Sequence, residues 1–247
     1  GQLADDPRAA QRNPFFAPVD VVLSNWKRDF ELWRIANKTT WQSGDERFSI
    51  GSFWSYKDLD HPILFWIDQL SNDFGVNLRY DNTADLLGHR NHFTAGISPT
   101  WGILQDHRFA NNLGNRGRRQ EPSPFGANAP SDSEQTSLNL DFYVQDRFYF
   151  LPQWALVIGA QVSYASRESD DHFPVSAANP DNSDQQEWWG FSPKAGVLWE
   201  VTPDVQAFAN VSRSFEPPSF GELVNANNEA RGLVALDAQT ATTIEVG

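Results

Sequence analysis

Apolar and polar residues alternate strictly along several stretches of the chain. In the segment SLNLDFYVQDRF, Leu138, Leu140 and Phe142 fall on one face and the polar residues between them fall on the other. The segment WALVIGAQVSY repeats the pattern, with an apolar face that runs from Trp154 to Tyr164. A period of two is typical of a β-strand with one apolar and one polar side.

The same alternation predicts an all-β chain of about nine strands and no helix. Two runs near 29–42 and 46–57 are expected to form a hairpin. The remaining strands are expected near 74–80, 92–101, 137–148, 154–164, 189–199, 205–213 and 240–247.

The connections between these runs alternate in length. Short links are expected near 43–45, 82–89, 150–153 and 202–204. Long links, rich in turn-forming residues, are expected near 58–72, 104–134, 166–187 and 216–237. Short turns at one end and long loops at the other are typical of an outer-membrane barrel.

The spacing of aromatic residues supports a membrane barrel. Trp154 and Tyr164 are ten positions apart on one face, as are Trp189 and Trp199. Such a stretch, tilted as in a barrel, spans ~23 Å. The apolar band of a membrane barrel is about 25 Å tall and is flanked by aromatic girdles. The sequence therefore predicts an antiparallel transmembrane β-barrel. The alternative is a soluble, secreted all-β module that binds carbohydrate.

Composition narrows the function classes. The chain has no Cys, which excludes disulfides and thiolate metal sites, and its net charge of −13 argues against nucleic acid as a partner. No apolar run approaches the roughly 18 residues of a spanning helix. The chain contains no Met and starts at Gly1, so we expect a fragment of a longer protein.

Three segments carry a family resemblance: NLDFYVQDRFYFLPQWALVIGAQ, FSPKAGVLWEVTPDVQAFANVSRSFEPPSFGELV and LDAQTATTIEVG. Over roughly residues 60–247 the chain resembles the TonB-dependent outer-membrane receptors of the siderophore type. The positions that match the family's motifs are Arg213, Phe215, Pro217, Pro218, Phe220, Glu222, Glu245 and Gly247.

The resemblance implies a barrel of about 22 strands, closed by an N-terminal plug, in the outer membrane of a Gram-negative bacterium. It implies a transporter rather than an enzyme, with no cofactor. Its cargo would be a scarce, bulky ligand, most often a ferric siderophore, and its energy would come through TonB. Another cofactor or an oligosaccharide is the alternative cargo. Residues 1–247 would then form the middle of the barrel, without the plug and the last strands, and 1–28 would form an extracellular loop.

The double proline is expected to end a strand. Pro217 and Pro218 cannot donate to a β-ladder, so they are expected to stop the strand before them and to stiffen the exit into a loop. Arg213, Glu216 and Glu222 flank this stop.

Candidate ligand residues come from the long links. The basic cluster NRGRR supplies Arg116, Arg118 and Arg119, whose guanidinium groups suit an anionic ligand. Contact with lipopolysaccharide phosphates and a solvated loop without a ligand are the alternatives. Alternation places Trp189 on the lipid side and Trp188 toward the lumen, which favours Trp188 as a ligand platform. Other lumen-facing residues are expected to contact a plug: Arg79, Asp141, Gln145, Arg147, Gln161 and Lys194.

Catalytic and metal motifs are weak. The chain has no Gly-x-Ser-x-Gly, P-loop or His-Glu-x-x-His pattern. His89 and His92 are spaced like metal ligands, but we interpret them as solvated turn residues. The acidic segments 168–172 and 179–184 offer oxygen ligands for Ca²⁺, but they lack the spacing of an EF-hand. We interpret them as solvated loops and predict no metal site.

Overall fold

Nine long strands form one antiparallel sheet in which each strand pairs with the next in the chain. The computed structural model describes residues 26–63, 65–110, 131–177, 180–224 and 232–247. The strands are β1 (Asp29–Ser43), β2 (Glu46–Pro62), β3 (Phe65–Asn82), β4 (Asn91–Ala110), β5 (Asp132–Leu151), β6 (Trp154–Asp171), β7 (Asp184–Thr202), β8 (Val205–Glu216) and β9 (Gln239–Val246). The predicted all-β fold with nine strands is confirmed.

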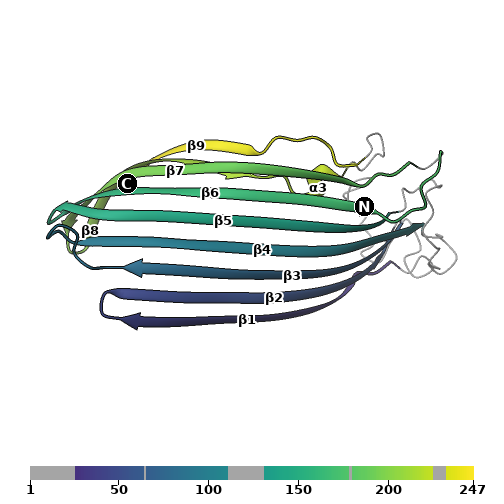
Figure 1. Cartoon of the computed structure of the whole chain (residues 1–247), viewed down its shortest axis with the longest axis horizontal. Coiled ribbons are helices and arrows are strands. Elements are labelled where there is room, and N and C mark those ends of the chain that lie inside the picture. The colour runs from purple at the N-terminus through teal and green to yellow at the C-terminus, as the bar shows by residue number, and fades with distance from the viewer. Residues whose placement is uncertain (1–25, 64, 111–130, 178–179, 225–231) are drawn as a thin grey trace, which may run out of the picture.

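The sheet is bent into a curved wall (Figure 1). β1 pairs only with β2, and β9 pairs only with β8, among the residues placed in the structure. The described strands thus make an arc of a barrel wall. A four-residue helix, α3 (Phe220–Leu223), follows β8, so the expectation of no helix is wrong at this point.

Tight connections gather at one end of the sheet. The links at 44–45, 83–90, 152–153 and 203–204 join consecutive strands there, close to the predicted short links. Gly44 adopts a positive φ of 56°, which a glycine accepts without steric cost. We call this the short-turn end and the opposite edge the loop end.

One predicted long link is wrong. Residues 58–72 belong mostly to β2 and β3, which remain paired up to Pro62 and Trp66. The apolar alternation fades in this stretch, but backbone hydrogen bonds do not need an apolar face. For the same reason β4 reaches Ala110 and β6 reaches Asp171, which shortens the links expected at 104–134 and 166–187. The strands therefore continue beyond the apolar band.

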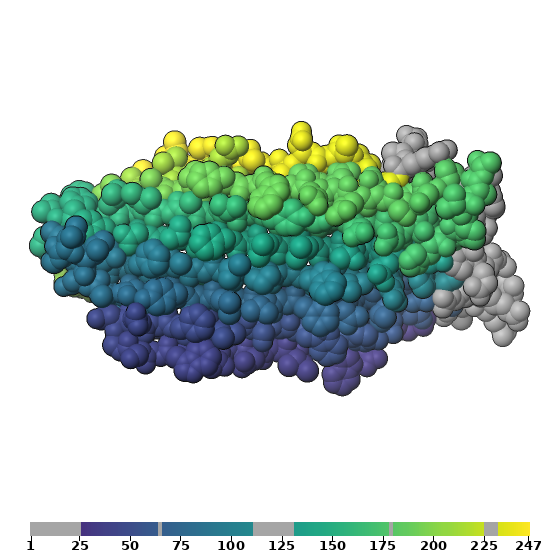
Figure 2. All heavy atoms as spheres, viewed as in Figure 1, coloured from purple at the N-terminus to yellow at the C-terminus, as the bar shows by residue number. Residues whose placement is uncertain are grey.

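Large apolar side chains cover the outer face, the side of the sheet away from α3. Examples are Phe142 at 52%, Ile158 at 53% and Phe191 at 58% exposure. Figure 2 shows this face as a continuous surface across the strands. Lipid would satisfy such a surface, whereas water would not.

Aromatic pairs form two belts on this outer face. Near the short-turn end, Trp154 stacks on Trp199 with 5.1 Å between ring centroids, and Trp41 stacks on Phe48 at 5.9 Å. Toward the loop end, Tyr164 meets Trp189 at 4.8 Å and Phe74 meets Trp101 at 6.5 Å. We call these the inner-leaflet belt and the outer-leaflet belt; their positions match the predicted aromatic girdles.

No helix in the described part of the chain has the length and hydropathy needed to cross a bilayer.

Candidate functional site

Polar side chains line the opposite face of the sheet, which we call the inner wall. The strand register puts Gln145 beside Gly159 and Gly159 beside Lys194. It also aligns Arg79, Gly96, Tyr143 and Gln161 in one row. The six residues predicted to face the lumen therefore share this wall: Arg79, Asp141, Gln145, Arg147, Gln161 and Lys194. Their contact with a plug stays a prediction.

A buried carboxylate organises the inner wall near the short-turn end. Asp81 is 6% exposed and receives two hydrogen bonds from Arg79, at 2.8 Å from Nε and 2.7 Å from Nη2. The Thr94 hydroxyl donates to the same carboxylate at 2.8 Å, and His92 Nε2 lies 3.5 Å from it. This Asp81 cluster was missed because residue 82 was expected to begin a link.

A second carboxylate network lies on the inner wall closer to the loop end than the Asp81 cluster. Asp141 Oδ1 accepts hydrogen bonds from the Gln161 amide at 2.9 Å and from the Ser163 hydroxyl at 2.6 Å. Lys194 crosses over Gly159, where an added Cβ would come within 2.8 Å of its Cε. The wall thus presents a fixed polar surface, held by side chains of neighbouring strands.

An ion pair joins distant strands at the short-turn end. Arg90, in the β3–β4 turn, donates to Glu200 of β7 at 2.6 Å. Tyr149 of β5 donates its hydroxyl to the same carboxylate at 2.8 Å, and the Arg90 guanidinium lies 3.5 Å from the Tyr149 ring centre. We call this arrangement the Arg90–Glu200 clasp.

Arg167 on β6 is buried in the upper wall. Its side chain is among the buried charged groups, at 8% exposure. The guanidinium donates to the carbonyls of Leu138 and Ser166 and to Asn139 Oδ1, at 2.8–3.3 Å. No carboxylate pairs with it among the described residues. Arg167 was missed because 166–187 was expected to be a link.

The chain after β8 folds over the inner wall and forms what we call the strap, residues 217–224 and 232–236. Ser219 donates its backbone N–H and its hydroxyl to Glu222 Oε2, each at 2.8 Å, and this closes the turn of α3. Leu223 is fully buried, and Val224 bridges to Leu233. The Ser-x-x-Glu spacing at 219–222 is a helix-start signal that the sequence carried.

Polar residues of β7 anchor the strap. Asp184 accepts the Leu233 N–H at 2.9 Å, and Gln186 donates to the carbonyls of Leu233 and Val234, each at 3.1 Å. The Trp188 indole N–H donates to the Leu236 carbonyl at 2.9 Å. Trp188 therefore holds the strap, and a ligand contact by its ring stays a prediction.

The residues of the resembling motif lie on β8, in the strap and at the end of β9. β8 ends at Glu216, directly before Pro217 and Pro218, as expected. The Phe215 ring occupies the space that a side chain at Gly190 would need. Arg213 is exposed on β8, and Phe220 and Glu222 lie in α3. Glu245 on β9 accepts a hydrogen bond from Asn210 at 3.1 Å, and Gly247, directly after β9, exchanges two backbone hydrogen bonds with Phe208.

Several predicted residues lie outside the described part of the chain or apart from one another. Arg116, Arg118 and Arg119 fall outside the described residues, as do 1–25 of the expected loop 1–28. The His89 ring contacts Phe148, whereas His92 faces Asp81. Asp171 is used locally, because its carboxylate accepts hydrogen bonds from Asn182 and from the Phe173 N–H. No group of three or more His, Asp or Glu among the described residues is arranged to hold a metal ion.

The turn of α3 should depend on pH. The Ser219 N–H, and then its hydroxyl, lower the pKa of Glu222 below its ordinary value of 4.5. Because the folded pKa is depressed, this stabilisation is complete above the ordinary pKa and is lost as pH falls through the lowered one. We expect the amides of 219–224 to lose protection as the pH falls below this ordinary pKa and through the lowered one, measured by hydrogen exchange corrected for intrinsic rates. A Glu222→Gln variant should remove this step, and equal protection of the unaltered protein at pH 3 and pH 7 would contradict the assignment.

Comparisons with known proteins agree with this architecture. A family model described as TonB dependent receptor-like, beta-barrel matches residues 3–247. The metal-pseudopaline receptor CntO of Pseudomonas aeruginosa (strain UCBPP-PA14) is 30% identical over 98 residues, which are 40% of this chain and 14% of that receptor. This chain therefore spans only a small part of that relative.

Solved structures share the fold at low identity. The siderophore receptor PiuA from Acinetobacter baumannii superposes with a TM-score of 0.68 and 14% identity, over 89% of this chain and 37% of that one. The copper transporter OprC superposes with a TM-score of 0.67 and 11% identity, over 88% of this chain and 36% of that one. The closed form of the ferric-catecholate import receptor Fiu from K12 E. coli superposes with a TM-score of 0.63 and 13% identity, over 89% of this chain and 38% of that one.

The family match covers almost the whole chain, and the family is one of transporters rather than enzymes. Its barrels lie in the outer membrane of Gram-negative bacteria. The soluble carbohydrate-binding alternative is therefore wrong. The chain belongs to the TonB-dependent receptor β-barrel family, and its nine strands are part of such an outer-membrane barrel.

Proposed function

We propose that this chain is a section of the barrel of a receptor that imports a metal chelate, specifically a ferric siderophore, with energy supplied through TonB. The observation that carries the proposal is the strap, which folds over a polar inner wall at the loop end and is anchored there by Asp184, Gln186 and Trp188. A fixed polar surface at the mouth of a barrel suits capture of a bulky polar cargo.

The names of related proteins favour a metal-containing cargo. One relative is a metal-pseudopaline receptor, and the solved neighbours include a siderophore receptor and a copper transporter. Metal chelation by a small organic ligand is the chemistry that the first two names share. The oligosaccharide alternative has no comparable support, and a metal carried by a chelator other than a siderophore is the second candidate.

Growth on defined iron sources tests this proposal. A strain that lacks the parent receptor, and a strain with the receptor restored, would be grown under iron limitation on a panel of single ferric siderophores. We expect restored growth on one source or a few related sources. The matched control is the restored strain without a functional TonB, which should not grow on them. Rescue that is independent of the iron source, or growth without TonB, would contradict the proposal.

A further inference from the structure

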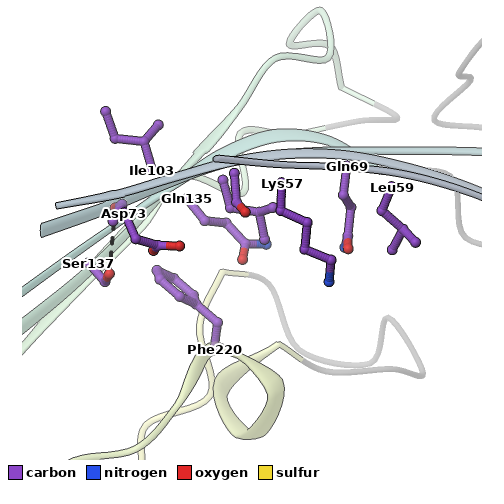
Figure 3. Close-up of a pocket in the computed structure, with 11 residues that line it drawn as sticks. Lys57, Leu59, Gln69, Asp73, Ile103, Gln135, Ser137 and Phe220 are labelled. Atoms are coloured by element: carbon purple, nitrogen blue, oxygen red, sulfur yellow. Dashed lines mark hydrogen bonds between the residues drawn. The ribbon is translucent and has the colours of Figure 1, made fainter. Parts of the chain in front are cut away.

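A hollow of about 300 Å³ lies between the strap and the inner wall (Figure 3). Lys57 comes from β2, Gln69 and Asp73 from β3, and Gln135 and Ser137 from β5. Across from them, Phe220 of α3 points its ring toward the wall, whereas Ile103 points away to the other side of the sheet. One aromatic ring of the strap thus faces a polar set from three strands.

The hollow lies at the height where external ligand arrives. Asp73 directly precedes Phe74 of the outer-leaflet belt. Lys57 directly follows Tyr56, whose ring centroid lies 6.3 Å from that of Trp54 on the outer face. The hollow is therefore level with the outer edge of the apolar band, at the loop end. The Asp81 cluster and the Arg90–Glu200 clasp belong to the short-turn end of the wall.

The positive charge of Lys57 in the hollow has no direct partner among the residues that the structure describes. The Lys57 ammonium makes no ion pair or hydrogen bond with any residue that the structure places. Gln69 is fixed by its hydrogen bond to Asp106 at 2.6 Å, so it cannot swing across to Lys57 without breaking that contact. Asp73 and Ser137 both lie close over Gly102, since an added Cβ there would be 2.6 Å from Asp73 Oδ1 and 2.9 Å from Ser137 Oγ. Lys57 is thus available to an anionic group.

The position of Phe220 is set by the strap. Its neighbour Ser219 is bonded to Glu222, and Leu223 is fully buried. The ring therefore supplies a flat apolar face at a defined place opposite the wall. A flat ring on one side and a cation on the other suit a planar anionic group, since stacking and charge act on different parts of it.

We propose that this hollow is a subsite for a flat anionic arm of the imported chelate, such as a phenolate or an aryl carboxylate, with Phe220 stacking on it and Lys57 meeting its charge. This inference rests on the proposed function and names the chemical class of the cargo. Phe220 and Lys57 are then specificity-determining residues, and Asp73 is placed to accept a hydrogen bond from a hydroxyl on the same arm.

Binding to the purified parent receptor in detergent tests the subsite. The probes are the ferric complex of 2,3-dihydroxybenzoate, which is anionic and aromatic, and ferric citrate, which is anionic without a ring. We expect Phe220→Leu to weaken the aryl probe by about three- to tenfold and to leave any citrate binding unchanged. Lys57→Gln should weaken the aryl probe by a similar factor, measured by calorimetry or by quenching of Trp fluorescence.

Matched controls separate the subsite from general damage. Phe142→Leu changes an aromatic on the outer face, and Lys38→Gln removes an inner-wall ammonium on β1; both should bind the aryl probe as the unaltered receptor does. Shifted migration of the unheated barrel in gels verifies folding of each variant. The subsite is overturned if Phe220→Leu and Lys57→Gln bind the aryl probe normally, or if the unaltered receptor does not bind it. Neither result affects the growth experiment, which tests iron import independently.

Discussion

Replacing Phe142 by Arg should destabilise the barrel by about 2–4 kcal/mol, because a charge would be forced into the middle of the hydrocarbon. Phe142 lies on the outer face of β5 at 52% exposure, between its cross-strand partners Ile97 and Val162. The measurement is urea unfolding of the parent receptor in lipid vesicles, followed by Trp fluorescence.

The control for this experiment places the same charge on the other face. Ser98 pairs with Asp141 and follows Ile97, so it lies at almost the same depth but on the inner wall. Ser98→Arg should cost less than Phe142→Arg, since its charge stays in a polar lumen beside a carboxylate. Equal costs, or a larger cost for Ser98→Arg, would show that the assignment of the two faces is wrong.

Replacing Asp81 by Asn should destabilise the receptor by about 2 kcal/mol, because a buried charged acceptor is lost while Arg79 and Thr94 keep their donors. Three side chains converge on this carboxylate, which is 6% exposed. The free energy of unfolding would be measured as for Phe142→Arg.

Two further variants make the Asp81 experiment specific. Asp85→Asn, in the exposed β3–β4 turn, should change stability by less than about 0.5 kcal/mol. Adding Arg79→Ala to Asp81→Asn should cost less than the sum of the single changes, since both remove the same contact. Strict additivity would mean that the Arg79–Asp81 pair contributes nothing to stability.

Alternation predicted most of the fold because the membrane imposes it. Phe142 and Ile158 must meet lipid, so apolar residues recur at every second position through the band. Beyond the band this demand ends, and residues 58–72 no longer alternate even though their backbones stay paired. The sequence could therefore locate the part of each strand inside the membrane but not the part above it.

The sequence predicted the candidate site only where it depends on the alternation of side chains between the two faces of a strand. This alternation placed Gln145 and Lys194 on one wall, as the register has them. The strap depends instead on contacts between segments far apart in the chain, such as Trp188 with the carbonyl of Leu236. Its start was encoded locally in Ser219 and Glu222, but the wall that it covers was not.

The Arg90–Glu200 clasp restricts widening of the barrel wall at the short-turn end. A sheet joined only between neighbours can widen through small adjustments that add up from ladder to ladder. The clasp runs from Arg90, directly before β4, to Glu200 on β7, so it bounds that sum over three ladders at once. The width of the short-turn mouth is therefore held by a contact between strands that are not neighbours, as well as by the backbone ladders.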